Sequence, residues 1–284
     1  MDEVTVRVPA TTANLGPGYD CLGVALRLYN QITVRRSRSG TKLPAIVSEA
    51  GESFFKKVAV RPFRFRCKIT GEVPQARGLG SSVTVRLGVL AALNKIAETG
   101  LSSFELFKLC AALEGHPDNA APAAFGGFTV ACGLQKPQRF EVRGLYFVLI
   151  VPNFEVATAT ARKVLPKKVL LEDAAMSSAN ACRVTAALAS GKPQMLRGCF
   201  DDRLHQPYRI KLVPFMNDVI AAGVHAGAIG GFLSGSGSTV ACVTTKKPAQ
   251  VAAAMHRAVP GTAAPQVLVL LADNTGARVV RQAF

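Results

Sequence analysis

The sequence has 284 residues, of which 49% are hydrophobic and 18% are charged, and its formal charge is +16 at pH 7. A chain of this length can form two modest domains or one large one, and this composition excludes an intrinsically disordered protein. No stretch approaches the roughly 20 unbroken apolar residues that a membrane span requires, so a membrane-spanning protein is excluded as well.

The cysteines and the N-terminus indicate the compartment. The seven cysteines are odd in number and no two are spaced as C-x-x-C, which favours reduced thiols over disulfides or a zinc site. The chain begins Met1-Asp2-Glu3 and shows no signal peptide. We therefore expect a cytoplasmic protein.

The first 70 residues predict three strands and little helix. Val4, Val6 and Val8 alternate with polar residues, as in a half-buried strand, and Pro9 is expected to end that strand. The elements expected next are a loop at 11–23, a second strand at 31–36, a helical turn or two at 53–58 and a basic strand at 61–69.

The basic strand raises the question of a polyanionic partner. Its apolar residues alternate with Arg64, Arg66 and Lys68, which is the pattern of a half-buried strand whose basic face is solvated. The alternative, which the charge of +16 keeps open, is a surface for nucleic acid. Because no aromatic residues are interleaved on the basic face for base stacking, we do not expect nucleic acid to bind.

The remaining elements mix helices and strands without a strict alternation, which favours an α+β fold. Residues 83–96 predict a long helix that is buried nearly all round, and a second helix begins at Ser102 or Ser103 and runs to Leu113. The later elements are strands at 145–151, within 230–243 and at 267–271, and helices at 157–165, 174–188, 219–227 and 249–259. We place the domain boundary near Pro152, with domains at 1–151 and 152–284.

Between the basic strand and the long helix lies the glycine-rich loop Pro74–Ser82. Gly78 and Gly80 allow close approach of the backbone, and a helix N-terminus with unpaired N–H groups favours an anion. Ser81 and Ser82 place hydroxyls where a helix cap or a metal ligand belongs. The loop therefore predicts a nucleotide phosphate site, with an ordinary serine cap after a turn as the alternative.

Three further segments carry polar residues that packing alone does not explain. Asn14 and Asp20 lie in the loop 11–23 and are suited to an ammonium group, with an Asx turn as the alternative. The segment 114–119, Glu-Gly-His-Pro-Asp-Asn, is too sparse in ligands for zinc, but Glu114 together with Ser82 suits magnesium. The segment 231–240 predicts a tight glycine turn that approaches a ligand, or else a plain hairpin.

Arg162 and Arg209 are candidates for binding a carboxylate, because a guanidinium matches the geometry of that group. The sequence contains no G-x-x-x-x-G-K-[ST] motif, which excludes a P-loop enzyme. His-Arg-Asp and Asp-Phe-Gly are also missing, which excludes a protein kinase.

These four segments, in this order, resemble the GHMP small-molecule kinases, and among them the homoserine kinases. The glycine loop is similar to the phosphate loop of all GHMP kinases, whereas the segments 10–23 and 114–119 point to homoserine kinases. The resemblance implies a two-domain α+β GHMP kinase fold. Its N-terminal domain is ribosomal protein S5 domain 2-like with a left-handed βαβ unit, against the usual hand, and its C-terminal domain is ferredoxin-like.

The resemblance also implies ATP-dependent phosphorylation of the side-chain hydroxyl of L-homoserine, a step of threonine biosynthesis, with ATP and Mg²⁺. The implied metal ligands are Ser82 and Glu114, and the implied ATP-binding residues are Pro74, Ala76, Arg77, Gly78, Leu79, Gly80, Ser81 and Ser82. The implied homoserine-binding residues are Asn14, Asp20, His116, Asn119, Thr158, Arg162, Arg209 and Gly235.

Phosphoryl transfer asks mainly for positioning and charge neutralisation, so a dedicated base is not obligatory. We assign Asn119 to orienting the homoserine hydroxyl, with Asp118 as the alternative base. Two other functions stay open: another GHMP kinase, such as one acting on mevalonate, and a non-catalytic relative that binds nucleic acid through its basic surface. A homodimer is one assembly that the sequence allows.

Three departures from the family pattern bear on ATP binding. Larger residues follow Ser82, including Arg86, which we expect to point to solvent more readily than to ATP. Ser238 stands where the family has a proline, which is expected to loosen a turn. The segment between Gly40 and Arg61 is shorter than usual, and in the family it helps to shape the adenine pocket.

Overall fold

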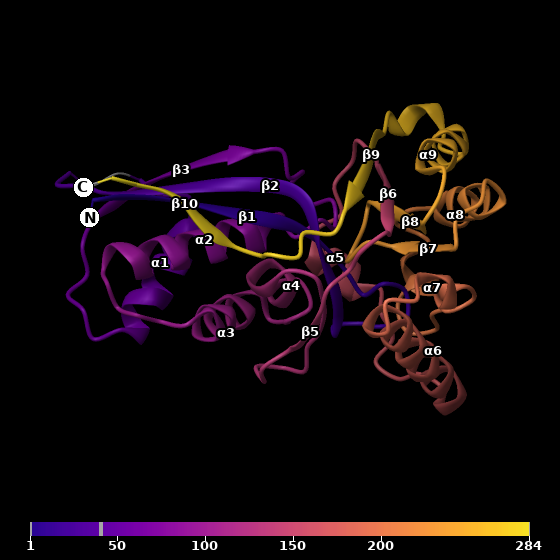
Figure 1. The fold of residues 1–284 in the computed structure, drawn as a ribbon, viewed down its shortest axis with the longest axis horizontal. Helices are drawn as coiled ribbons and strands as arrows, with labels where there is room; N and C mark the ends of the chain where they lie inside the picture. The colour runs from indigo at the N-terminus through magenta and orange to yellow at the C-terminus, as the bar shows by residue number, and fades with distance from the viewer. Residues whose placement is uncertain (1, 40–41, 284) are drawn as a thin grey trace.

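The computed structural model describes residues 2–39 and 42–283, which form two β-sheets with helices packed on them (Figure 1). In the first sheet the strand order is β10-β1-β2-β4-β5, and β3 also pairs with β2. All of the pairings that the structure describes in this sheet are antiparallel. Its strands are β1 (Glu3–Ala13), β2 (Leu22–Arg36), β3 (Phe65–Gly71), β4 (Phe128–Val130), β5 (Gln138–Phe140) and β10 (Arg278–Ala283).

Four helices cover one face of this sheet, below the strands in Figure 1. They are α1 (Ala45–Lys57), α2 (Ser81–Ile96), α3 (Ser103–Glu114) and α4 (Ala120–Phe125). The alternating Val4, Val6 and Val8 point toward them and are buried in one hydrophobic core with the apolar side chains of α2. Helix α2 is buried on nearly all sides, as its two apolar faces predict.

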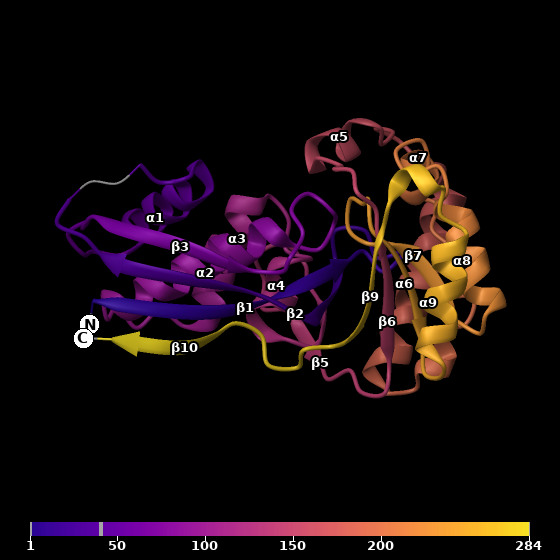
Figure 2. The ribbon, with the colours of Figure 1, turned by 90° about the horizontal axis from the view of Figure 1, so that it is seen from above.

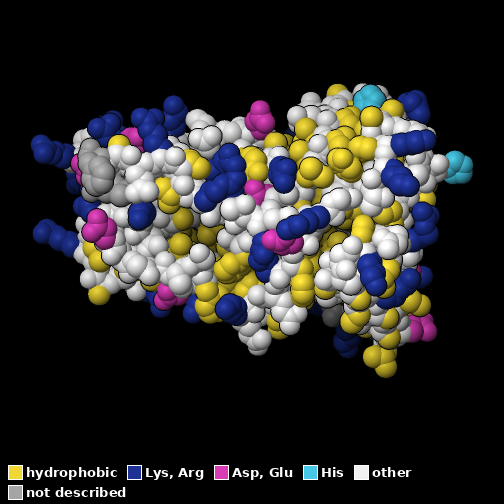
Figure 3. Space-filling model, viewed as in Figure 1, with side chains coloured by type: hydrophobic (Ala, Val, Ile, Leu, Met, Phe, Trp, Pro, Cys, Tyr) yellow, Lys and Arg dark blue, Asp and Glu magenta, His cyan; other side chains and the backbone are white. Residues whose placement is uncertain are grey.

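The other face of the first sheet carries basic side chains. Arg35 and Arg66 pair across β2 and β3 and are exposed, and Lys68 is exposed two residues further along β3. This arrangement is the solvated basic strand expected from the alternation. Figure 3 shows Lys and Arg side chains spread over both halves of the face seen there, with fewer Asp and Glu among them.

Pro9 does not end the first strand, contrary to expectation. Strand β1 continues to Ala13, and its register with β2 shifts between Pro9 and Ala10. Such an irregularity is one of the few places where a strand tolerates a proline, which has no N–H to donate. The continuation matters because it places Thr11 beside the glycine loop, where its N–H donates to the Leu79 carbonyl, and Thr12 beside Ser234 of the segment 231–240.

The second sheet is antiparallel with the order β7-β8-β6-β9. Its strands alternate between two cores: Phe147 and Leu149 pack toward the first sheet and α6, whereas Val148 and Ile150 pack toward α8 and α9. Figure 2 shows these strands running across the direction of the first sheet. The elements of this half are β6 (Tyr146–Val151), β7 (Gly230–Leu233), β8 (Val240–Thr244), β9 (Gln266–Leu271), α5 (Thr158–Lys163), α6 (Leu171–Ala189), α7 (Gln206–Arg209), α8 (Met216–His225) and α9 (Pro248–Arg257).

The chain passes from the first sheet to the second before β6, and not at the expected boundary of 151/152. Strand β6 ends at Val151 but already belongs to the second sheet, and β10 returns to pair with β1 in the first. The chain therefore crosses between the sheets before β6 and again after β9. Among the residues that the structure describes, no helix is long and apolar enough to cross a membrane.

One hydrophobic core joins the sheets, because Phe128 of β4 and Phe147 of β6 belong to it and are both fully buried. We predict that Phe147→Ala lowers the free energy of unfolding by about 3–5 kcal/mol and that both halves unfold in one transition. Urea denaturation followed by circular dichroism measures the free energy of unfolding and the number of transitions. Val280→Ala, at a residue 46% exposed, is the control and should change stability by less than about 0.5 kcal/mol. Two separated transitions would contradict the shared core.

Candidate active site

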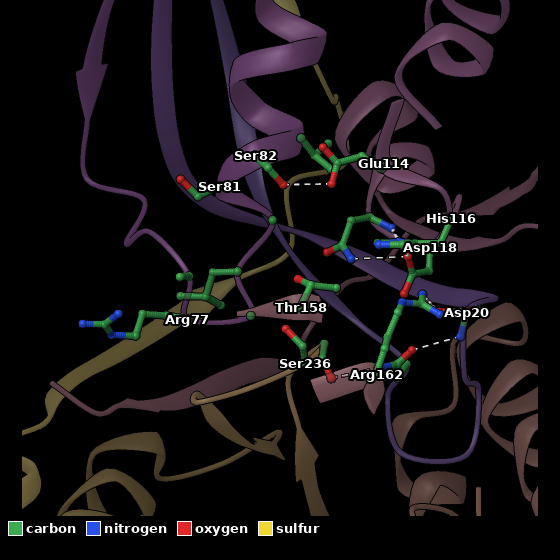
Figure 4. Close-up of a pocket in the computed structure, with 18 of the residues that line it drawn as sticks. Asp20, Arg77, Ser81, Ser82, Glu114, His116, Asp118, Thr158, Arg162 and Ser236 are labelled. Atoms are coloured by element: carbon green, nitrogen blue, oxygen red, sulfur yellow. Dashed lines mark hydrogen bonds and ion pairs between the residues drawn. The ribbon is translucent and has the colours of Figure 1, made fainter. Parts of the chain in front are cut away.

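A cavity of about 220 Å³ collects residues from both halves of the chain. Figure 4 shows its polar side chains converging from the β1–β2 loop, the start of α2, the end of α3 and the start of α5. It is lined by Asn14, Asp20, Ala76, Arg77, Gly78, Leu79, Gly80, Ser81, Ser82, Val83, Glu114, His116, Asp118, Asn119, Thr158, Arg162, Arg209, Gly235 and Ser236. The segments singled out in the sequence therefore meet in one place.

The glycine loop is held against two of these segments by contacts that only glycine permits. Gly78 has φ 73°, and a Cβ there would lie 2.1 Å from the carbonyl oxygen of Ser234. Gly80 has φ 67°, and a Cβ there would lie 2.0 Å from Oγ1 of Thr11. The Ser234 hydroxyl donates to the Gly78 carbonyl at 2.7 Å. The loop thus takes its shape from close packing on β1 and on the segment 231–240, which we call the third motif.

Helix α2 begins directly after this loop with its N-terminus at the cavity. Gly80 is its N-cap in the left-handed conformation, and no side chain caps the helix. Among the described residues, no acceptor is recorded for the N–H groups of Ser81, Ser82 and Val83. These donors and the positive end of the helix dipole form an anion site.

Helix α3 brings a carboxylate to the same place. Its start is fixed by a capping box between Ser102 and Glu105, and its end is fixed by Gly115 in the left-handed conformation. Glu114, the last helical residue, accepts a hydrogen bond from the Ser82 hydroxyl at 2.8 Å. A serine and a carboxylate are oxygen ligands that suit Mg²⁺, whose other ligands are phosphate oxygens and water. The donor set therefore fits the expected metal.

Arg86 was expected to point to solvent, and the structure shows otherwise. Its guanidinium does not point to solvent: it donates to Glu114 at 2.5 Å and to Glu49 of α1 at 2.9 Å. Helical spacing puts Arg86 on the same side of α2 as Ser82, since the two are four residues apart. The carboxylate of Glu114 is therefore bonded by Ser82 on one oxygen and by Arg86 on the other.

An ion pair occupies the opposite end of the cavity. Asp20 and Arg162 are 2.7 Å apart, and Arg162 also donates to the Tyr19 hydroxyl at 2.8 Å. The Asn14 side chain accepts from the Asp20 N–H at 3.0 Å and donates to the Gly235 carbonyl at 3.0 Å. Asn14 thereby ties the loop 11–23 to the third motif, and its own amide is engaged with protein groups.

Arg209 is the second guanidinium of the cavity and is held more tightly. Its side chain donates to the carbonyls of Ala161 at 3.2 Å and Gly235 at 3.0 Å. Its contact with His205 Nδ1 at 3.2 Å needs a neutral ring, whose Nε2 donates to Gly16 at 2.7 Å. Burial lowers the pKa of His205, which favours that neutral form.

Asp118 forms a fixed polar cluster with its neighbours. His116 Nδ1 lies 2.6 Å from Asp118 Oδ1, and the Asn119 N–H donates to the same oxygen at 2.9 Å. The Thr11 hydroxyl donates to Asn119 Oδ1 at 2.7 Å, which orients the amide. Burial by itself would lower the pKa of His116, but the hydrogen bond and charge of Asp118 outweigh it and raise the pKa.

Ser238 does not loosen the third motif, contrary to expectation. The residue is fully buried, and its hydroxyl donates to the Phe154 carbonyl at 2.7 Å. Backbone hydrogen bonds from Ser234 to Thr239 and from Gly237 to Ser234 close the turn around it.

A second, larger groove adjoins the cavity and shares Ala76, Ser81 and Ser82 with it. Its volume is about 600 Å³, and it extends between α1, β3 and the start of α2. Its other lining residues are Asn30, Pro44, Ile46, Ile69, Thr70, Gly71, Val73, Gln75 and Val85. The short segment 40–61 contributes to it through Pro44 and Ile46, while residues 40 and 41 lie outside the described residues.

Nearly all of the residues predicted for the site line the cavity. Pro74 does not, and the Arg77 side chain turns away from Ser82, donating to the Pro152 carbonyl at 2.9 Å (Figure 4). Four residues of the site were not among those predicted: Ser236 and Val83, which line the cavity, and Thr11 and Tyr19, which bond to residues that do. Thr11 and Tyr19 could have been predicted only from their closeness in sequence to Asn14 and Asp20.

Comparisons with known proteins agree on one family. The family described as GHMP kinases N terminal domain matches residues 45–127, and GHMP kinases C terminal matches residues 185–261. The homoserine kinase of Clostridium kluyveri is 35% identical over 99% of this chain and 100% of its own length. That of Moorella thermoacetica is 40% identical over 89% of this chain and 91% of its own. The crystal structure of homoserine kinase from Cytophaga hutchinsonii is 25% identical, with a TM-score of 0.88 over 99% of this chain and 98% of that one.

The contact between His116 and Asp118 predicts a titration that can be observed directly. The pKa of His116 should lie above the usual value of about 6.5, and Asp118→Asn should bring it below that value, because burial is then the largest remaining effect and the charges of Asp20 and Arg162 oppose each other. NMR titration of the ring measures both, with His116→Gln to assign the signal. Since the folded-state pKa is raised, the pair stabilises the fold below pH about 6.5 and loses this effect as the pH rises through the folded pKa. An unchanged pKa in Asp118→Asn would contradict the assignment.

Proposed function

This chain belongs to the GHMP kinases and, within them, to the homoserine kinases, and we propose that its cavity transfers the γ-phosphoryl group of ATP to L-homoserine. The product is O-phospho-L-homoserine, made as a step of threonine biosynthesis. One observation carries the assignment of the site: a helix N-terminus suited to phosphate and an ion pair suited to an amino acid face one small cavity. A nucleotide site alone would leave the ion pair unexplained.

The ion pair supports homoserine as the acceptor. The α-ammonium and α-carboxylate of an amino acid are attached to one carbon, so a neighbouring carboxylate and guanidinium can bind them together. Asp20 and Arg162 are about one-third exposed, at 32% and 37%, so exchanging their mutual contact for substrate costs little desolvation. Arg209 and Asn14 complete the pocket wall on this side. Mevalonate has a carboxylate but no ammonium, and it would leave Asp20 unmatched.

The other end of the cavity supports a nucleotide. The N–H groups at the start of α2 donate hydrogen bonds to the β- and γ-phosphates, and the adjoining groove holds the base and ribose between Ile46, Ile69 and Val73. The two cavities share Ala76, Ser81 and Ser82, so one extended ligand can occupy both. Ser82 and Glu114 would hold Mg²⁺, which supplies charge neutralisation at the phosphates when it is bound.

The geometry favours Asn119 over Asp118 for acting on the homoserine hydroxyl. Asp118 is only 2% exposed, and one of its oxygens is already bonded to His116 and to the Asn119 N–H. The Asn119 amide is oriented by Thr11, and its Nδ2 group donates one hydrogen to Asp118 Oδ1 at 3.3 Å, which leaves the second hydrogen for donation toward the cavity. Asn119 then aligns the hydroxyl oxygen with the phosphorus, and the α2 amides bind the transferring phosphoryl group. His116 and Asp118 act by holding Asn119 in place.

The reaction is tested by ADP release from ATP and Mg²⁺, with homoserine, serine, threonine, mevalonate and shikimate as acceptors. We expect homoserine to give the highest kcat/KM by a wide margin. A rate that does not respond to homoserine, or a preference for mevalonate, would contradict the proposal.

The phosphate end predicts that Ser82→Ala lowers kcat by roughly 10²-fold while changing the KM for homoserine little, because the lost hydroxyl acts on the phosphates and their metal. Steady-state kinetics measure both constants. Ser48→Ala is the matched control, since Ser48 does not line the cavity and its hydroxyl donates to Glu52. Wild-type kinetics in Ser82→Ala would remove Ser82 from the site.

At the amino-acid end of the cavity, we expect a substitution to change the KM for homoserine. Asp20→Asn should raise the KM for homoserine by about 10–100-fold, because it removes the charge that binds the ammonium, and should leave the KM for ATP nearly unchanged. Asp201→Asn is the matched control, because Asp201 forms an exposed ion pair with Arg203 away from the cavity. If Asp20→Asn raised the KM for ATP as much as the KM for homoserine, the two substrates would not bind at separate ends of the cavity as proposed.

A further inference from the structure

Arg86 forms an ion triad with Glu114 and Glu49 at the end of the cavity where Ser82 and Glu114 lie. The proposed reaction assigns no role to this arginine. Its guanidinium lies between Glu114 of α3 at 2.5 Å and Glu49 of α1 at 2.9 Å. The side chains of Arg86 and Glu114 are 17% and 7% exposed, whereas Glu49 is 52% exposed. The contact between Arg86 and Glu114 is therefore the sheltered one, and Glu49 holds the outer side of the guanidinium.

The triad leaves one oxygen of Glu114 for the cavity. Oε1 accepts from Arg86, and Oε2 accepts from Ser82, which lines the cavity. Glu114 lines the cavity, but Arg86 does not, so the guanidinium approaches the carboxylate from behind. Arg86 is thus in contact with a proposed metal ligand without access to the phosphates themselves.

We propose that Arg86 is a resident counter-ion of Glu114 that fixes the carboxylate as a one-oxygen ligand and weakens its affinity for a divalent cation. The proposal rests on the proposed function, because it takes Ser82 and Glu114 as the ligands of the nucleotide-bound metal. Arg86 acts through Glu114 and is a positioning residue. It sets how strongly nucleotide binding depends on Mg²⁺.

The direction of the effect follows from charge. With Arg86 present, Glu49, Arg86 and Glu114 sum to −1, and without it they sum to −2. A more negative site attracts Mg²⁺ more strongly and repels the phosphates of a metal-free nucleotide. Removing Arg86 should therefore tighten binding in the presence of Mg²⁺ and weaken it in the absence of Mg²⁺. Damage to the fold would weaken both.

The test compares ADP binding by the full chain in excess Mg²⁺ and in EDTA, measured by isothermal titration calorimetry at pH 8. Arg86→Met keeps the unbranched stem of the side chain as far as the position of Nε and removes the charged guanidinium. We expect the ratio of the metal-free to the metal-bound Kd to rise on the order of tenfold over wild type in Arg86→Met, with the Mg²⁺ midpoint shifted to lower concentration. Arg86→Lys, which keeps the charge, should stay within about threefold of the wild-type ratio.

Arg278→Met is the matched control, because Arg278 is a half-buried arginine paired with the buried Asp273 and does not line the cavity. Its ratio should equal that of wild type. An unchanged ratio in Arg86→Met, or weaker binding under both conditions, would overturn the role of Arg86 while leaving the proposed function intact. If the wild type binds ADP under neither condition, both the inference and the nucleotide site are overturned. Melting temperatures of all variants check that each is folded.

Discussion

The close packing of the glycine loop on two distant segments is the constraint on which the site depends. Gly78 lies against the backbone at Ser234, and Gly80 lies against the side chain of Thr11, with no room for a Cβ at either contact. These contacts aim the N-terminus of α2 at the residues that face it across the cavity. The third motif comes from the second half of the chain, so the same contacts also hold the two halves together at the site.

Each carboxylate that we assign to the cavity already has a basic protein partner. Asp20 pairs with Arg162, Glu114 pairs with Arg86, and Asp118 pairs with His116. The pairs differ in exposure: Asp118 is nearly inaccessible, whereas Asp20 and Arg162 are open to solvent. Buried pairs of this kind maintain geometry, and exposed pairs exchange partners readily. The cavity is thus rigid next to Asn119 and adaptable where an amino acid would bind.

Much of the site could be predicted from the sequence because its residues lie in short segments with strong local signals. The glycine loop before a long apolar helix and the serines at the start of α3 are such signals, and both helix starts were confirmed. The partners of Arg86 could not be predicted, because Glu114 and Glu49 are 28 and 37 residues away and no local rule pairs them. The extension of β1 past Pro9 depends on a register shift against β2, and the return of β10 to β1 depends on long-range pairing. The larger groove beside the cavity could not be predicted for the same reason, since α1, β3 and α2 form it only once they are packed.

The central claim is that phosphate and amino acid bind at opposite ends of one cavity, and a crystal structure with a non-hydrolysable ATP analogue and L-homoserine tests it most directly. We expect the phosphates within hydrogen-bond distance of the N–H groups of Ser81–Val83, with the base in the adjoining groove. The α-carboxylate of homoserine should contact Arg162 and its ammonium Asp20, with the hydroxyl beside Asn119. Homoserine bound away from this ion pair, or phosphates away from the start of α2, would contradict the account.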